Sequence, residues 1–330
     1  MLGQKHPRAA WLVEALCDVG GLQPGETAGA TGDIGELRRL GHFAIGAGLV
    51  IGAIAGAILG VLHAIVHLQN DPLNDIPTFY VGAQRLNAGE TLYPPGADPD
   101  RIPYYFYPPL LAILLRPFAL LPYPIFAALW EAGTILVFVL FVRRLGFNRR
   151  TAIALGLLGG QIADVLSIGQ SQAHIAWLLS LGSPFAIALA GQIKIFPALV
   201  ALYWLGRRDW RKLGWFVAWS VALVLLQVVL EPRESLAFVR GLGLQQVGTY
   251  DQLSPYAFAP WLWFGLVVAF LVITPLVART RFGWAAAVAF SSLVYPRLFG
   301  YHLLSLGAAL KPPDDQPKNT AITRRPPGSG

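Results

Sequence analysis

The sequence predicts an all-α, polytopic membrane protein. Of its 330 residues 55% are hydrophobic and only 13% are charged, whereas a soluble domain usually has about 25% charged residues. The mean hydropathy is +0.53. The segment Phe43–Val66 contains no Asp, Glu, Lys or Arg, and it is longer than the about 20 residues that a spanning helix needs. We expect about eight to ten membrane helices between residues 43 and 310.

Further apolar runs follow the first helix. They are Ile125–Val142, Thr151–Ile168, Leu213–Leu230, Tyr256–Ala278 and Phe282–Leu310. The stretch Ala173–Leu205 is also apolar, but Gly182-Ser183-Pro184, Lys194 and Pro197 interrupt it. It is therefore either one broken crossing or a tight set of three short ones. Within the first helix, glycines recur every four residues and share one face, which predicts close packing of a neighbouring helix; they are Gly48, Gly52, Gly56 and Gly60.

A polar loop and a short apolar stretch lie between the first two runs. The short stretch starts at Tyr107-Pro108-Pro109-Leu110 and ends at Leu120-Leu121-Pro122. It is too short to cross a bilayer and suits an interfacial helix. Such a helix would form the floor of a lipid-entry groove.

Cationic residues predict the orientation, because loops rich in Lys and Arg stay cytoplasmic. Arginine pairs such as Arg143-Arg144 and Arg149-Arg150 mark one side, while Gln69–Phe106, in which five acidic residues outnumber two arginines, lies on the other. Asp75 then faces the extracytoplasmic side. Both termini are cytoplasmic on this prediction: residues 1–42 form an extension, 43–310 the membrane domain, and the charged, Pro-rich residues 311–330 a disordered tail.

Several classes of function are excluded or disfavoured. The net charge of +7 follows from the loop bias, and no basic run alternates with aromatic residues as in a nucleic-acid groove. The single cysteine, Cys17, excludes an intrachain disulfide. His63 and His67 are four residues apart, but no third metal ligand is evident, so we interpret them as interface histidines. Asp98-Pro-Asp100 imitates an Asp-x-Asp metal motif without its strand context, and we expect no metal.

An ordered set of short motifs resembles glycosyltransferase family 87, whose C-type (GT-C) membrane enzymes include mycobacterial mannosyltransferases of phosphatidylinositol mannosides. The matching elements are Asp75, Tyr80, Ala83, Gly89, Tyr93, Tyr107-Pro108-Pro109-Leu110, Leu121-Pro122, Gly169-Gln170 and Lys194-Ile195-Phe196-Pro197. They occur in the family's order and cover about residues 43–210. The resemblance implies a helical GT-C fold with an extracytoplasmic loop and an interfacial helix.

The resemblance also implies a reaction. A hexose, mannose in the first instance, would pass from a polyprenyl-phosphate donor to a lipid or glycan acceptor, without a soluble cofactor and without nucleic acid. This chemistry needs a base for the acceptor hydroxyl and cations for the leaving phosphate. Asp75 is the candidate general base. The candidate substrate-binding residues are Tyr80, Tyr107, Gln170, Lys194, Arg297 and His302.

Each main candidate also has a structural interpretation. Asp75 could be a helix cap. Lys194 lies in an apolar run, where a charge costs about 2.5–3.5 kcal/mol on insertion scales, so it either meets a phosphate or an acid or extends to a nearby interface. Arg297 could pair with Glu131 or Asp164 instead of a phosphate.

Two other classes of function remain as alternatives. A secondary transporter would use charges near the bilayer midplane and often has internal repeats, but the sequence shows no duplicated half. A catalytically silent protein that binds lipid-linked glycans is the nearer alternative. It is kept because the connection from Gly169-Gln170 to Lys194 is shorter than the family leads us to expect, and because Tyr295–His302 differs from the family's C-terminal pattern.

Overall fold

The computed structural model describes residues 32–96, 101–241 and 253–313, and their regular elements are all helical. Among them, four helices are long and apolar enough to cross a membrane, and a bent pair of shorter helices is a fifth candidate. The four are α2 (Gly32–Asn70), α5 (Tyr123–Leu145), α11 (Trp210–Leu230) and α13 (Pro260–Val277). The pair is α6 (Arg149–Leu157) and α7 (Gly159–Ile168), bent by 65°. An all-α polytopic membrane protein is confirmed.

Fewer spans are found in the described part of the chain than the eight to ten expected, because two apolar runs fold into short helices. The run Ala173–Leu205 contains α8 (Gln172–Leu181), α9 (Pro184–Ile193), η2 (Phe196–Ala201) and α10 (Leu202–Arg207). A helix of 10 residues such as α8 is about 15 Å long, half of the about 30 Å hydrocarbon core. Of the two alternatives for this run, the set of short helices is the one observed.

Local sequence explains these breaks. Gly182 follows α8 in the left-handed conformation with φ 61°, which glycine adopts without strain. Ser183 then caps α9 by accepting a hydrogen bond from the Ala186 N–H. The run Phe282–Leu310 is also divided, into α14 (Gly283–Leu293) and η4 (Gly300–Leu310). The non-helical segment between them contains Pro296.

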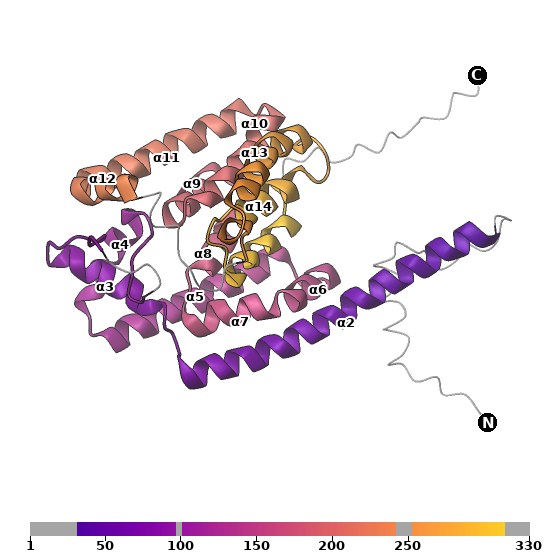
Figure 1. Ribbon diagram of the computed structural model, residues 1–330, viewed down its shortest axis with the longest axis horizontal. Coiled ribbons are helices and arrows are strands. Elements are labelled where there is room, and N and C mark those ends of the chain that lie inside the picture. The colour runs from indigo at the N-terminus through magenta and orange to yellow at the C-terminus, as the bar shows by residue number, and fades with distance from the viewer. Residues whose placement is uncertain (1–31, 97–100, 242–252, 314–330) are drawn as a thin grey trace, which may run out of the picture.

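The long helix α2 packs against α6 and α7 through the glycines of its one face (Figure 1). A Cβ on Gly56 would overlap the Gly156 carbonyl, and one on Gly60 would overlap the Gly159 carbonyl. The two backbones are therefore in direct contact, as the glycine repeat predicted. A Cβ on Gly48 would meet no other part of the protein within 4 Å, and in Figure 1 the N-terminal half of α2 extends beyond the body of the protein.

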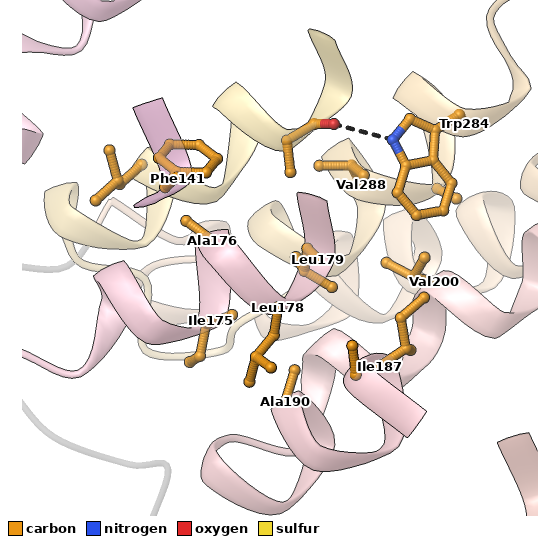
Figure 2. Packing of buried hydrophobic residues seen from close by; sticks show 14 of the residues in the cluster. Phe141, Ile175, Ala176, Leu178, Leu179, Ile187, Ala190, Val200, Trp284 and Val288 are labelled. Carbon is orange, nitrogen blue, oxygen red and sulfur yellow. Dashed lines mark hydrogen bonds between the residues drawn. The ribbon is translucent and has the colours of Figure 1, made fainter. Parts of the chain in front are cut away.

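The main hydrophobic core lies among the short helices (Figure 2). Leu179 of α8, Val200 of η2 and Val288 of α14 are fully buried there. Trp284 of α14 donates its indole N–H to the Ala308 carbonyl of η4 at 2.9 Å, so the one polar atom of this large side chain is satisfied. The short helices are held by mutual packing, and polar side chains are positioned on them.

A second core supports the loop after α2. It is formed by α3 (Ile76–Asn87), α4 (Pro109–Leu115) and the start of α5, and Figure 1 shows these elements at the end of the molecule where α2 finishes. The buried Glu234 carboxylate accepts hydrogen bonds from the Leu92 N–H at 2.8 Å and the Thr91 hydroxyl at 3.0 Å. Glu234 belongs to α12 (Pro232–Gly241). The remaining short elements are η1 (Phe118–Leu120) and η3 (Pro255–Ala257).

The short apolar stretch predicted as an interfacial helix is α4 followed by η1. Seven residues form α4, which is too few to span a bilayer. One side of α4 is buried in the second core, and the Leu110 N–H donates to the Gln227 side chain of α11 at 3.3 Å. Its length agrees with the prediction.

Candidate active site

Asp75 stands at the start of α3, five residues after α2 ends. Its backbone is held by α7, because the Asp75 N–H donates to the Ile168 carbonyl at 3.0 Å and the Leu73 N–H donates to the Ser167 carbonyl at 2.8 Å. The Asp75 carboxylate makes no capping hydrogen bond to α3. It accepts one at 2.6 Å from the side-chain amide of Gln170. The carboxylate is thus turned away from the helix-cap role and toward the interior.

Gly169 explains why Gln170 reaches Asp75. Gly169 ends α7 in the left-handed conformation with φ 75°, and a Cβ at this position would overlap the side chain of Ile76. Only glycine satisfies both the backbone conformation and the close contact. The Trp130 indole donates to the Gly169 carbonyl at 2.8 Å. The pair Gly169-Gln170 therefore brings the end of α7 against the start of α3.

The orientation of the Gln170 amide is determined by its neighbours. Its Oε1 accepts from the Tyr107 hydroxyl at 3.2 Å and from the Ser171 N–H and hydroxyl at 2.8 and 3.0 Å. Because three donors face Oε1, the NH₂ group faces Asp75. A continuous hydrogen-bonded path therefore runs from the Asp75 carboxylate through Gln170 to Tyr107.

Lys194 is the buried cation of the site. It follows α9 in an extended conformation, and only 6% of its surface is exposed. Its ammonium donates to Gln172 Oε1 at 3.1 Å, lies 3.4 Å from His302 Nε2, and stands 4.7 Å from the centre of the Tyr301 ring. These contacts exclude extension to an interface. The lysine points into the protein.

The electrostatics couple Asp75 and Lys194. Burial raises the pKa of Asp75 from 3.8 to about 6, although Lys194 and the Gln170 hydrogen bond act in the opposite direction. Burial also lowers the pKa of Lys194 from 10.5 to about 7, against the effect of Asp75. At neutral pH most Asp75 is ionised and can accept a proton, while Lys194 is divided between its two forms. An arriving anion would favour the ammonium.

His302 responds to the charge of Lys194. Burial and the Lys194 cation keep the pKa of His302 well below its ordinary 6.5, so the ring is neutral. An ammonium at Lys194 only donates, which requires His302 Nε2 to accept and places the ring proton on Nδ1, 3.2 Å from the Phe299 carbonyl. In the other tautomer Nδ1 accepts from the Phe299 N–H at 3.0 Å. The ammonium form of Lys194 therefore fixes one tautomer of His302, whereas the neutral amine, which can donate or accept, is compatible with both.

Lys194 and His302 line a small, partly open pocket of about 50 Å³. Lys194 and Arg297 supply positive charge, His302 supplies a neutral ring, and aromatic side chains form much of the wall. Those aromatic residues are Phe106, Tyr107, Phe196, Phe238, Tyr295, Phe299 and Tyr301. A cationic pocket with aromatic walls suits an anionic group that carries a sugar. Asp75 does not line the pocket but lies behind Tyr107, with Gln170 between them.

The structure brings most of the predicted residues together. Tyr107, Lys194, Arg297 and His302 line the pocket, and Gln170 joins it to Asp75. Arg297 lies in the segment between α14 and η4 and over the Phe299 ring, 5.1 Å from its centre, so it and His302 share no helix face.

Tyr80 is placed elsewhere. Its hydroxyl donates to the Leu121 carbonyl at 3.0 Å, and its ring packs against Tyr123 and Phe126. Its contacts join α3 to the start of α5, and it does not line the pocket.

Two pocket residues, Tyr295 and Tyr301, were not among the candidate site residues. Tyr295 stacks on the His302 ring at 4.0 Å between centres, and Tyr301 lies beneath Lys194. Both belong to the C-terminal element Tyr295–His302, whose density of aromatic residues is the signal that could have found them. Gln172 does not line the pocket, but it accepts the Lys194 hydrogen bond, and its amide donates to the Ser305 hydroxyl at 2.6 Å.

Some sequence predictions lie outside the described residues. The Asp98-Pro-Asp100 motif falls there, as do residues 1–31 of the predicted extension and 314–330 of the predicted tail. The helix α2 begins at Gly32, within the predicted extension.

Comparison with known proteins agrees with the resemblance. The model of glycosyltransferase family 87 matches residues 105–294, more than half of the chain, and this match begins after Asp75. A polyprenol-phosphate-mannose-dependent alpha-(1-2)-phosphatidylinositol pentamannoside mannosyltransferase from Mycolicibacterium smegmatis is 28% identical over 205 residues, which are 55% of this chain and 48% of that protein. The chain thus matches about half the length of this relative. No solved structure matches. With a matching family model and membrane helices, the chain belongs to glycosyltransferase family 87.

Proposed function

We propose that the protein transfers a hexose, mannose in the first instance, from a polyprenyl-phosphate donor to a hydroxyl of a lipid or glycan acceptor on the extracytoplasmic side of the membrane. One observation carries the proposal: the Asp75 carboxylate is joined through Gln170 and Tyr107 to a cationic, aromatic pocket. The similarity to a polyprenol-phosphate-mannose-dependent enzyme supports the choice of donor.

The donor phosphate would bind at Lys194 and Arg297. Both side chains line the pocket, and hydrogen bonds from cations to phosphate are about twice as strong as neutral ones. The bond between the anomeric carbon and the phosphate oxygen breaks, and polyprenyl phosphate leaves with the electron pair. Lys194 would be fully charged at this stage, because a phosphate nearby raises its pKa from about 7.

Asp75 would accept the proton of the acceptor hydroxyl as that oxygen attacks the anomeric carbon, with inversion. A pKa of about 6 suits this role, since the group is mostly ionised at neutral pH and is more basic than an ordinary aspartate. Gln170 orients the carboxylate. The acceptor must approach between Asp75 and the pocket, so side chains around Tyr107 move when substrates bind.

The extracytoplasmic placement rests on the loop charges. Asp75 lies on the acidic side of the membrane domain, and the arginine pairs lie on the other side. The N-terminus and the C-terminus are cytoplasmic on the same argument.

The test is transfer from radiolabelled polyprenyl-phosphate mannose, glucose and arabinose, each offered with a total lipid extract to the purified protein. We expect label in a lipid or glycan product from the mannose donor, and none with Asp75→Asn. Asp71→Asn is the matched control, because Asp71 is an exposed carboxylate in the same turn. Donor binding without turnover by the unmodified protein would favour the silent binder of lipid-linked glycans.

A further inference from the structure

Three side chains with metal-binding atoms meet away from the pocket. His63 and His67 are near the end of α2, Asp164 is on α7, and their ligand atoms all lie within 4.8 Å of one another. Figure 1 shows α2 and α7 running side by side, and they are in direct contact. No third ligand was evident from the sequence, but the structure places Asp164 beside the pair, 101 residues from His63 along the chain.

The arrangement follows from the helix geometry. Residues four apart share one face of a helix, and the rings of His63 and His67 meet edge to face with 4.5 Å between centres. The contact of Gly60 with Gly159 lies one turn before. Because that contact brings the two backbones together, the Asp164 side chain on α7 reaches the His63 ring, and Asp164 Oδ1 lies 2.6 Å from His63 Nε2.

The donor set is typical of a divalent transition metal. Imidazole nitrogens and a carboxylate suit Zn²⁺ and its neighbours, and sites with three protein ligands keep one position open for water. Two histidines at i and i+4 on one helix face are a known way of presenting such ligands. The group is partly exposed, with 45% of the His63 side chain and 24% of the Asp164 side chain accessible, so an ion can enter.

The distance between His63 and Asp164 is that of a hydrogen bond. Zn²⁺ ligands stand about 2.0–2.1 Å from the metal, so two of them at a tetrahedral angle lie about 3.3 Å apart. The observed 2.6 Å is shorter and is a hydrogen-bond distance, with one proton between the two atoms. A metal would replace that proton and move the two atoms apart by less than about 1 Å, since metal binding releases protons from its ligands.

We propose that His63, His67 and Asp164 bind one divalent transition metal ion, of which Zn²⁺ is the representative, and that the ion fixes the end of α2 to α7. The ion would lie close to the two segments that form the candidate active site. The segment after α2 carries Asp75, and the end of α7 carries Gly169 and Gln170. A metal between the two helices holds the two segments that meet at the carboxylate. Metal binding at these three residues does not depend on whether the protein transfers sugar.

Metal binding is measured directly on the full chain. The protein is purified in detergent with a tag that contains no histidine, stripped with a chelator, and titrated with Zn²⁺ and with Co²⁺ as a spectroscopic probe. Metal content, the Co²⁺ absorption spectrum and the Tm are recorded. We expect one ion per chain, a tetrahedral Co²⁺ spectrum and a higher Tm with metal.

The variants assign the site. His67→Gln and Asp164→Asn should each weaken binding at least tenfold. His42→Gln is the matched control, because His42 is an exposed histidine on the same helix outside the group, and it should bind as the unmodified protein does. Less than about one tenth of an ion per chain in the unmodified protein overturns the proposal. If His67→Gln and Asp164→Asn bind the metal as tightly as the unmodified protein does, the proposal is overturned as well, because the ion then lies elsewhere.

Discussion

Replacing Asp75 by Asn separates a catalytic role from a structural one. The side chain of Asn has the same shape and keeps an oxygen that can accept the Gln170 hydrogen bond. It removes the negative charge and the ability to take a proton. The transfer rate should fall by about 10²–10⁴, the usual contribution of a general base.

The effect on stability has the opposite sign. Raising the pKa of Asp75 from 3.8 to about 6 means that the folded protein carries a charge which burial disfavours. At about 1.36 kcal/mol per pKa unit, this amounts to about 3 kcal/mol above pH 6. The variant also loses the attraction to Lys194, which the pKa of Asp75 already includes. Without the Asp75 charge the pKa of Lys194 falls further, so less of this lysine is protonated. We expect a net gain of about 1–2 kcal/mol in the free energy of unfolding at pH 7.5.

The gain depends on pH in a defined direction. A carboxyl whose pKa is raised on folding binds its proton more tightly in the folded state, so it destabilises that state as the pH rises from 3.8 to about 6. The advantage of Asp75→Asn should be complete above pH 6 and absent below 3.8. The assay is the Tm in detergent from tryptophan fluorescence at pH 7.5 and at low pH, beside radiolabel transfer, with Asp71→Asn unchanged in both.

Two results would refute this reasoning. A lower Tm together with lost transfer would mean that the carboxylate is needed for the fold. Transfer above about one tenth of the unmodified rate would mean that Asp75 is not the base, since a base supplies more than that.

Three further predictions concern the same site. The pH profile of kcat/KM should be bell-shaped, rising through the pKa of Asp75 near 6 and falling as Lys194 loses its proton near 7. A flat profile from pH 5 to 8 would disprove these two roles. Lys194→Gln should raise the donor KM or lower kcat about 10–100-fold, the value of a charge-assisted hydrogen bond, as measured by initial rates, and unchanged kinetics would contradict phosphate binding. Gly169→Ala should lower the free energy of unfolding by about 1–3 kcal/mol and reduce transfer, because the new methyl overlaps Ile76. Ile76→Ala in the same chain should restore part of the stability and part of the transfer rate. Simple additivity of the two Tm changes would argue against the contact.

Some features were predictable because they depend on local composition or on period. The first membrane helix follows from a long uncharged run, and its contact with α6 and α7 follows from glycines that share one face. Lys194 was a candidate because a buried charge is costly and needs a partner. The partners it has, Gln172 and His302, lie 22 and 108 residues away, and no local pattern identifies them.

Other features depended on how segments meet in space. Tyr80 matched the family in order and spacing, but its hydroxyl reaches the Leu121 carbonyl, because the face of α3 that carries it packs against α5. Within the described residues four or five helices are long enough to cross a membrane, fewer than the eight to ten expected, since hydropathy does not distinguish a short helix buried in protein from one in lipid. Only packing decided that α8 and α9 are core helices.

The sequence by itself determined the class of the protein, the membrane setting, the first helix and the residue types that sugar transfer requires, because hydrophobic length, charge bias and ordered motifs are properties of the chain. The tertiary structure decided which polar groups meet. Asp75 and Gln170 are 95 residues apart, and His63 and Asp164 are 101 apart. Both contacts exist because glycines let α7 approach α2 and α3, and side-chain chemistry at such distances along the chain depends on that approach.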